Sequence, residues 1–304
     1  MPLSIPGIHH ITAIASDPRK NVWFYRDFLQ LRLVKKTVNF DDPGTYHFYF
    51  GDEMGRPGTI LTFFPWPGVS AGRRGTGEVS AVQFDVPAGS LGYFTQRSKE
   101  HGVESGGVDT RLSGEDVLTV FDPDGLRLEL IEGALDADHP HRIRGFHGAT
   151  MSLEGYEATA RLMTEAFGYK LVNEEENRFR YVAQSGVEGP GTFVDLMCTP
   201  DIRRGSMGAG TVHHIAWRTE NDETQLAWRK NLIELGYNVT PVMDRQYFHS
   251  IYFRERGGVL FEIATDPPGF TTDEKPAELG THLKLPPWLE PRRFVIEQIL
   301  PSLD

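Results

Sequence analysis

Two pairs of neighbouring histidines and one glutamate have the residue types of a metal-binding site. The pairs are His9-His10, close to the N-terminus, and His213-His214, in the last third of the chain. Both pairs lie in stretches of alternating apolar residues, in which successive side chains point to opposite faces of a strand. We therefore expect His10 and Thr12 to share one face of the first stretch, and His214 to occupy the corresponding face of the second.

The glutamate is Glu262, within the apolar run Val259-Leu260-Phe261-Glu262-Ile263. A buried carboxylate is costly unless a cation or a hydrogen-bond donor faces it. Two imidazoles and one carboxylate are the facial triad of non-haem Fe(II) oxygenases, which leaves coordination sites for substrate and O2. The pattern predicts that His10, His214 and Glu262 bind Fe(II), with Mn(II) as the alternative ion. A lone histidine would more often be a structural core residue, but two matched pairs favour the metal.

The composition favours an enzyme that acts on a small molecule. The chain has 304 residues, 39 % hydrophobic and 24 % charged, which are the values of a soluble globular protein with a substantial core. A net charge of −11, without any basic run longer than Arg73-Arg74 or Arg203-Arg204, argues against nucleic-acid binding. No apolar run approaches the roughly 18 residues of a membrane span. The N-terminus has no signal-peptide pattern and Cys198 is the single cysteine, so we expect a cytoplasmic protein.

Four segments of the chain share one pattern, in which a glycine and an alternating strand precede a helical stretch and several short strands. The opening strands begin at Gly7, Gly77, Gly145 and Gly210. Glu262 follows His214 by 48 positions (262 − 214), and Glu129 follows Ala81 by the same 48 positions (129 − 81). This common spacing indicates one supersecondary unit used four times.

Helical stretches follow the opening strands. Asp17-Pro18 predicts the start of the first helix, because aspartate is a good N-cap and proline suits the first helical position. Analogous helices are expected at residues 90–101, 156–167 and 223–235, each followed by a glycine that can end a helix. We expect a further short helix over residues 290–300, after a proline-rich loop.

This fourfold βαβββ pattern resembles the vicinal oxygen chelate superfamily, which includes glyoxalases, bleomycin-resistance proteins and extradiol dioxygenases. The resemblance covers roughly residues 7–266. It implies an α+β fold in which paired units form two half-open barrels, whose concave faces hold a metal. We predict two domains of two units each, residues 1–137 and 143–266, and an extension at 267–304. Because the expected ligands belong to the first and last units, those two units must lie together in space.

Longer stretches resemble ring-cleaving dioxygenases of the hydroquinone 1,2-dioxygenase type. They are residues 7–12, 45–52, 57–66, 212–216 and 244–254. The resemblance implies the same three metal ligands and a second set of residues around the substrate and oxygen, namely His9, Thr12, His213, Arg245 and Tyr252. It implies a reaction in which Fe(II) binds the ionised hydroxyl of a hydroquinone, or of a related phenol or catechol, and O2 then opens the ring.

Each residue of that second set has a simpler alternative role. Arg245 could stabilise an anionic oxygen or form a surface salt bridge. Tyr252 could relay a proton or pack within its strand. His9 and His213 could act near the substrate or only hold the liganding strands in place. His47, in an aromatic strand, is expected to be a core residue.

The second and third units lack the candidate ligand histidines, although His147 of the third unit matches His9. Ala81 stands where the fourth unit has His214, and Gly148 stands where the first unit has His10. Glu129 remains as a carboxylate without histidine neighbours, and we interpret it as structural. The sequence therefore predicts one metal site per chain.

Two other functions remain open at this point. A glyoxalase-like isomerase or thiol transferase usually holds Zn or Ni with four protein ligands, two of them carboxylates, whereas the first unit has Thr62 where the second acid would be. A non-catalytic protein that binds an aromatic compound or drug needs no metal, so the complete set of three ligands argues against it. A homo-oligomer is compatible with the sequence, which shows no interface.

Overall fold

The computed structural model describes residues 3–112, 114–184 and 189–303, which fold into four modules of similar make-up. The first module contains β1 (Ile8–Ala15), α1 (Pro18–Val22) continued by the π-helix η1 (Trp23–Phe28), β2 (Arg32–Asn39), β3 (Asp42–Gly51) and β4 (Ile60–Pro65). The second contains β5 (Glu78–Val86), α2 (Ser90–His101), β6 (Ser105–Arg111), β7 (Glu115–Phe121) and β8 (Arg127–Glu132).

The third and fourth modules repeat this order. The third contains β9 (Gly145–Leu153), α3 (Glu157–Arg161) continued by the π-helix η2 (Leu162–Ala166), β10 (Tyr169–Glu175), β11 (Arg178–Ala183) and β12 (Phe193–Cys198). The fourth contains β13 (Val212–Thr219), α4 (Asp222–Glu234), β14 (Met243–Asp244), β15 (Phe248–Arg254) and β16 (Leu260–Pro268). The predicted α+β fold of four βαβββ modules is confirmed.

The strands form two eight-stranded sheets, and each sheet takes one module from each half of the chain. One has the order β14-β15-β16-β13-β1-β4-β3-β2, and the other β10-β11-β12-β9-β5-β8-β7-β6. In both, the opening strands of two modules pair antiparallel at the centre, β1 with β13 and β5 with β9. The first and last modules therefore lie side by side, as the expected ligands require. The domain bounds 1–137, 143–266 and 267–304 stay a prediction.

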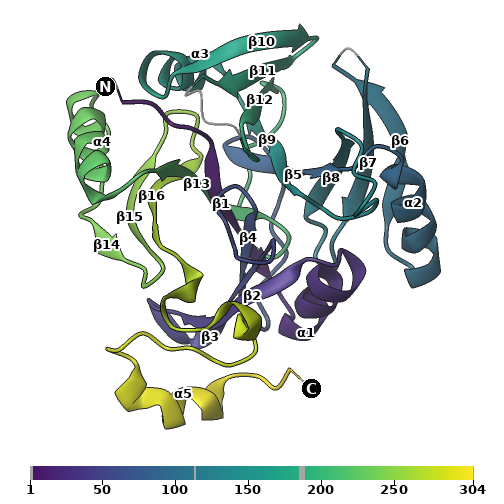
Figure 1. The fold of residues 1–304 in the computed structure, drawn as a ribbon. Helices are drawn as coiled ribbons and strands as arrows, with labels where there is room; N and C mark the ends of the chain where they lie inside the picture. The colour runs from purple at the N-terminus through teal and green to yellow at the C-terminus, as the bar shows by residue number, and fades with distance from the viewer. Residues whose placement is uncertain (1–2, 113, 185–188, 304) are drawn as a thin grey trace.

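Local sequence accounts for the ends of the helices, which lie at the periphery of the molecule (Figure 1). The Asp17 carboxylate accepts hydrogen bonds from the backbone amides of Arg19 and Lys20, with Pro18 at the first helical position. Gly102 follows α2 with a φ of 64°, a conformation that glycine adopts without strain. The π-helical turns in the first and third modules were not predicted, since apolar periodicity does not separate them from α-helix.

The C-terminal extension packs against the first module. It contains the short helices η3 (Phe270–Thr272), η4 (Pro276–Glu278), η5 (Glu290–Arg292) and α5 (Arg293–Ile299). Lys35 of β2 is fully buried, and its ammonium group lies 2.6 Å from the Asp273 carboxylate and also contacts Glu274. This ion pair ties the extension to β2, and α5 lies beneath the neighbouring strand β3 in Figure 1.

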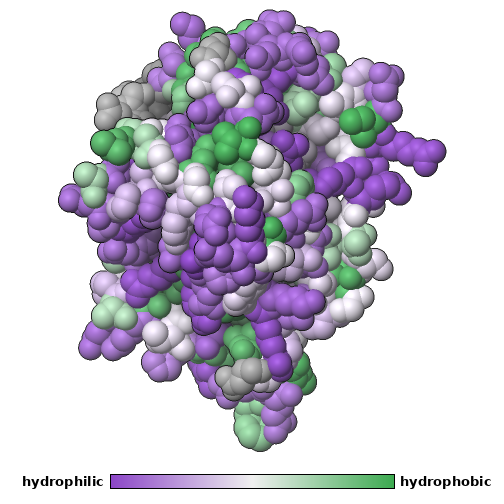
Figure 2. Space-filling view, turned by 90° about the vertical axis from the view of Figure 1, so that its right-hand side faces the viewer, coloured by the Kyte–Doolittle hydropathy of each residue, from purple (hydrophilic) through white to green (hydrophobic). Residues whose placement is uncertain are grey.

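The surface is mainly polar. On the face shown in Figure 2, hydrophobic side chains occur in small patches among hydrophilic ones. Within the described ranges, no helix has the length and apolar character needed to cross a membrane.

Candidate metal centre

The strand register brings His10, His214 and Glu262 to one face of the first sheet. In the β1–β13 pair, Thr12 lies opposite His214 and His10 lies opposite Ala216. In the β13–β16 pair, Ala216 lies opposite Glu262. Ala216 is thus the backbone neighbour of both His10 and Glu262. Its methyl group leaves open the space between them, where an ion would have to lie.

The ligand atoms of these residues converge. Nε2 of His214 lies 2.9 Å from Oε2 of Glu262, Nε2 of His10 lies 3.3 Å from the same oxygen, and the two Nε2 atoms are 3.3 Å apart. Metal–ligand bonds of about 2.1 Å at right angles separate neighbouring ligand atoms by about 3 Å. The three atoms therefore have the spacing of one face of an octahedral site. In the part of the chain that the structure describes, this is the one His, Cys and acid cluster with such convergence.

The carboxylate also has the electrostatics of a ligand. Glu262 is fully buried, and its Oε2 atom forms no hydrogen bond of acceptable geometry within the described residues, although both imidazoles face it. Its other oxygen accepts a hydrogen bond from the Ser250 hydroxyl. Burial opposes ionisation, but His10 and His214 outweigh it and hold the pKa of Glu262 well below its ordinary value. A divalent cation fits this buried negative charge.

In each pair, the histidine outside the candidate metal site, His9 or His213, holds the candidate ligand beside it in place. Nδ1 of His9 lies 2.9 Å from Nδ1 of His10, and Nδ1 of His213 lies 2.8 Å from Nδ1 of His214. Burial, with His10 nearby, lowers the pKa of His9 well below its ordinary value, and burial with His214 nearby lowers the pKa of His213 to about 3. Both outer imidazoles are therefore neutral. They can accept the Nδ1 hydrogens of His10 and His214, whose Nε2 lone pairs would then be free to bind an ion.

A pocket of about 250 Å³ opens beside the two histidine ligands. Its wall is largely aromatic, with polar groups from the first and fourth modules. The lining residues are His10, Thr12, Asn39, Phe40, Asp41, His47, Tyr49, Phe64, Trp66, His213, His214, Arg245, Phe248 and Tyr252.

Arg245 and Tyr252 form one polar group in this wall. Nε of Arg245 donates to the Tyr252 hydroxyl over 3.3 Å, and Nη1 lies 3.0 Å from the Asp41 carboxylate. Arg245 therefore makes both the salt bridge and the pocket contact that the sequence left as alternatives. Burial, together with Glu262, raises the pKa of Tyr252, so its hydroxyl keeps its proton.

His47 is not a plain core residue, contrary to the expectation from sequence. It lines the pocket, its Nε2 lies 2.8 Å from the Thr62 hydroxyl, and its Nδ1 lies 2.9 Å from the Tyr49 hydroxyl. The Thr62 hydroxyl in turn lies 2.9 Å from that of Thr12. A signal was present in the sequence, since His47 and Tyr49 are two residues apart and so share a face of β3. The sequence did not show that this face meets Thr62.

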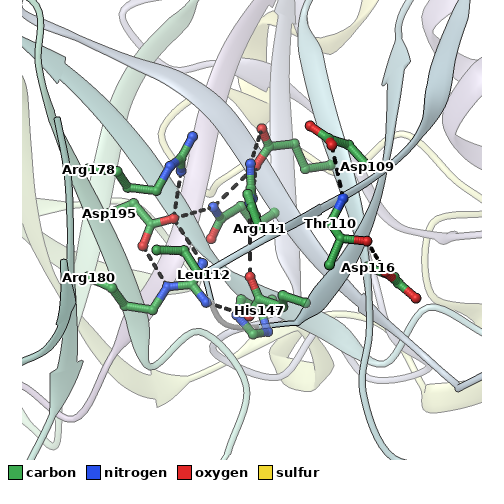
Figure 3. Close-up of polar contacts among 12 residues, drawn as sticks. Asp109, Thr110, Arg111, Leu112, Asp116, His147, Arg178, Arg180 and Asp195 are labelled. Carbon is green, nitrogen blue, oxygen red and sulfur yellow. Dashed lines mark hydrogen bonds and ion pairs between the residues drawn. The ribbon is translucent and has the colours of Figure 1, made fainter. Parts of the chain in front are cut away.

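The corresponding position of the second sheet is occupied by ion pairs (Figure 3). Gln83 and Glu129 are backbone partners there, as Ala216 and Glu262 are in the first sheet. The Gln83 amide nitrogen lies 3.2 Å from the Glu129 carboxylate and 2.9 Å from that of Asp195. Its amide thus fills the space that Ala216 leaves open in the first sheet.

Arginines neutralise the two acids of this second cluster. The guanidinium groups of Arg178 and Arg180 each approach the Asp195 carboxylate to 2.7 Å, and that of Arg111 bonds both oxygens of Glu129. Burial opposes ionisation of Asp195, but the arginines outweigh it and lower its pKa to about 2. The structural role expected for Glu129 agrees with these contacts.

The sequence matches the family model described as the Glyoxalase/Bleomycin resistance protein/Dioxygenase superfamily over residues 7–130 and 147–263. The chain belongs to this superfamily. Glyoxalase I from Zea mays, a member by name, has the same fold, with a TM-score of 0.65 and 16 % identity over 86 % of this chain and 92 % of that one.

Other similar proteins in the superfamily carry dioxygenase names. MhqO of Bacillus subtilis, named as a ring-cleaving dioxygenase, is 47 % identical over 96 % of this chain and 95 % of its own length. The chlorohydroquinone/hydroquinone 1,2-dioxygenase of Sphingobium indicum is 36 % identical over 95 % of this chain and 94 % of its own. A Bacillus subtilis crystal structure, named as a dioxygenase, superposes with a TM-score of 0.93 at 46 % identity, covering 99 % of this chain and 98 % of that one.

Proposed function

We propose that this chain is an Fe(II)-dependent dioxygenase that cleaves the ring of a hydroquinone, or of a related phenol or catechol, with O2. The observation that carries the proposal is the convergence of His10, His214 and Glu262 beside an aromatic pocket. The names of the similar proteins support the same reaction class. We further propose an extradiol-type reaction in the cytoplasm, with Mn(II) as the alternative ion.

The choice of iron rests on the donor set. Two imidazoles and one carboxylate suit Fe(II) and leave coordination sites for two further molecules. When bound, Fe(II) lowers the pKa of a coordinated hydroxyl and supplies electrons to O2. The glyoxalase alternative is less well supported. Its second acid would stand at Thr62, whose hydroxyl is engaged by Thr12 and His47.

The residues behind the ligands act as positioning groups. His9 and His213 hold the two imidazoles in one tautomer, with Nε2 toward the ion, because each accepts the Nδ1 hydrogen of its neighbour. Ser250 holds one oxygen of Glu262 and so leaves the other free. Thr12 lines the pocket directly beside the ligand His10.

The residues of the pocket wall act on the substrate. The guanidinium of Arg245 places a positive charge at the wall, which stabilises negative charge on a substrate oxygen. The Tyr252 hydroxyl keeps its proton at neutral pH and can donate it in a hydrogen bond, while Arg245 donates to its oxygen. The aromatic side chains, among them Phe64 and Phe248, exclude water from around the ring.

Anaerobic reconstitution with Fe(II) tests the proposal. The protein should retain about one iron per chain and consume O2 when hydroquinone is added, with loss of the aromatic absorbance. The same preparation loaded with Zn or Ni should not isomerise a hemithioacetal. A protein that retains no metal, or that consumes no O2 with any member of a panel of hydroquinones, phenols and catechols, would contradict the proposal.

A further inference from the structure

An internal symmetry relates the two tyrosines of the pocket. In the β15–β16 pair, Tyr252 lies opposite Glu262, and in the β3–β4 pair, Tyr49 lies opposite Thr62. Because β4 and β16 are the closing strands of equivalent modules, Thr62 is the counterpart of Glu262 and Tyr49 is the counterpart of Tyr252. Tyr252 lies beside β16, which supplies the candidate ligand Glu262. Tyr49 lies beside β4, which has Thr62 at that position and supplies no ligand.

An ion held by these three residues would consequently be left open on the side of β3 and β4. Ligand atoms come from β1, β13 and β16, and the fourth wall carries Thr62, whose hydroxyl is held by Thr12 and His47. A molecule that binds at the vacant coordination positions must therefore rest against this fourth wall.

The hydroxyl of Tyr49 is held in place on that wall. Its partner His47 has both ring nitrogens engaged, Nδ1 by Tyr49 at 2.9 Å and Nε2 by Thr62 at 2.8 Å, so the imidazole is fixed. Tyr49 is 1 % exposed, and burial raises its pKa well above the ordinary value, so it remains a neutral phenol. A phenol hydroxyl can form more than one hydrogen bond. Among the described residues, His47 is the one hydrogen-bond partner found for it.

The size of the pocket limits the ligand to one ring. A cavity of about 150 Å³ holds benzene, so the 250 Å³ here accommodate a single substituted ring. The ring centroids of His47 and Phe64 lie 4.3 Å apart with an interplanar angle of 44°, so this part of the wall is aromatic. If one hydroxyl of the ring binds the ion, the opposite end of the ring must contact a different group of the pocket wall.

We propose that Tyr49, oriented by His47, binds the ring hydroxyl that is not on the metal and thereby selects para-dihydroxybenzenes over monophenols. This assignment rests on the proposed function. Tyr49 acts by contact with the substrate, and His47 is a positioning residue. A catechol, whose two hydroxyls are adjacent, cannot place one on the ion and the other at the far end of the ring.

The test is direct binding to the iron-loaded protein without O2. We expect the wild type to bind hydroquinone about tenfold more tightly than 4-methylphenol, the effect of one additional hydrogen bond. Tyr49→Phe should bind the two about equally and retain its iron. Its turnover should show a raised KM for hydroquinone and a smaller change in kcat. His47→Gln, whose amide can still bond the Tyr49 hydroxyl, should keep more of the selectivity than His47→Ala.

Tyr237→Phe is the matched control, because Tyr237 is half-buried in a separate groove. This variant should keep the wild-type ratio of the affinity for hydroquinone to that for 4-methylphenol. An unchanged ratio in Tyr49→Phe would overturn the assignment, as would loss of the ratio in Tyr252→Phe with Tyr49→Phe unaffected. The two proposals fail differently. If the wild type retains no iron or consumes no O2, the dioxygenase proposal fails; if it does both and Tyr49→Phe keeps the ratio, only the assignment of Tyr49 fails.

Discussion

Glu262 is the residue from which the metal site could be predicted most directly. A carboxylate inside an apolar strand requires compensation, and the two histidine pairs were the compensation that the sequence offered. The structure brings the three side chains together, with Glu262 fully buried and both Nε2 atoms within 3.3 Å of its oxygen. The alternation of the strands was enough to select His10 and His214, rather than their neighbours, as the inward pair.

Removal of one imidazole should remove the metal and preserve the fold. In His214→Ala, the smaller side chain leaves two ligands, and we expect bound iron to fall to less than about a tenth of the wild-type content. Elemental analysis after anaerobic reconstitution measures this, with circular dichroism as the check of folding. Full iron retention in the folded variant would contradict the assignment of the ligands.

Restoring an acid at Thr62 should change the chemistry. Thr62→Asp places a carboxylate where the third module has Asp195, at the matching backbone position opposite a threonine. A fourth protein ligand would occupy a position that O2 or substrate needs, so O2 consumption with hydroquinone should fall about 10- to 100-fold while metal is retained. Thr62→Ser, which keeps the hydroxyl, is the control. Undiminished O2 uptake by the aspartate variant would show that Thr62 does not face the open side.

The role of His47 could not be predicted from the residue and its neighbours in sequence. Its neighbours in sequence are aromatic, so packing was the natural interpretation. Its hydrogen bonds to Thr62 and Tyr49 depend on which strand lies beside β3 and in which register, and neither can be derived from composition.

At the scale of elements, the pairing of β1 with β13 creates the site. Each strand contributes one imidazole, and their antiparallel register sets Thr12 opposite His214. The sequence showed that the first and last modules had to meet, since both carry ligands. It did not show that each sheet would contain one module from each half, because the backbone hydrogen bonds that decide this are the same for every pairing.

The extension depends on one buried lysine. Lys35 is fully buried between Asp273 and Glu274, so Lys35→Met should leave the buried Glu274 and the partly buried Asp273 without a cation and lower the free energy of unfolding by about 3–5 kcal/mol. Denaturant unfolding followed by fluorescence measures the change. Lys230→Met is the control, because the Lys230 side chain is 80 % exposed and its pair with Glu234 should contribute about 0–1 kcal/mol. Equal stability of the two variants would mean that the extension is not held through Lys35.

At the scale of the molecule, the two sheets compensate a buried carboxylate in two different ways. Both have an acid at the equivalent position of a closing strand, Glu262 of β16 in one and Glu129 of β8 in the other. We propose that the first binds a metal, whereas the second is neutralised by Arg111 and accepts a hydrogen bond from the amide of Gln83. The loss of the histidines from the second and third modules was visible in the sequence. The arginines were not, because they come from β6 and β11, whose faces cannot be aligned without the structure.

This arginine cluster should make stability dependent on acid pH. The pKa of Asp195 is about 2 in the folded protein and near its ordinary 3.8 when unfolded, so its contribution is complete above pH 4 and is lost as pH falls toward 2. Asp195→Asn should therefore be less stable than the wild type by about 3–5 kcal/mol at neutral pH, since two arginines lose their partner. The difference should shrink as the pH is lowered. Unfolding measured at several pH values tests this, and a difference independent of pH would exclude Asp195 as its source.

The antiparallel contact of β1 with β13 also sets the order in which a nascent chain can mature. His10 is synthesised well before its two partners, because His214 follows it by 204 positions (214 − 10) and Glu262 follows it by 252 (262 − 10). Until β13 arrives, β1 has hydrogen bonds to β4 alone on one edge, and the coordination sphere lacks two of its three donors. All three proposed ligands can therefore hold a metal only after the fourth module has folded, and a product truncated before that module would keep one of the three.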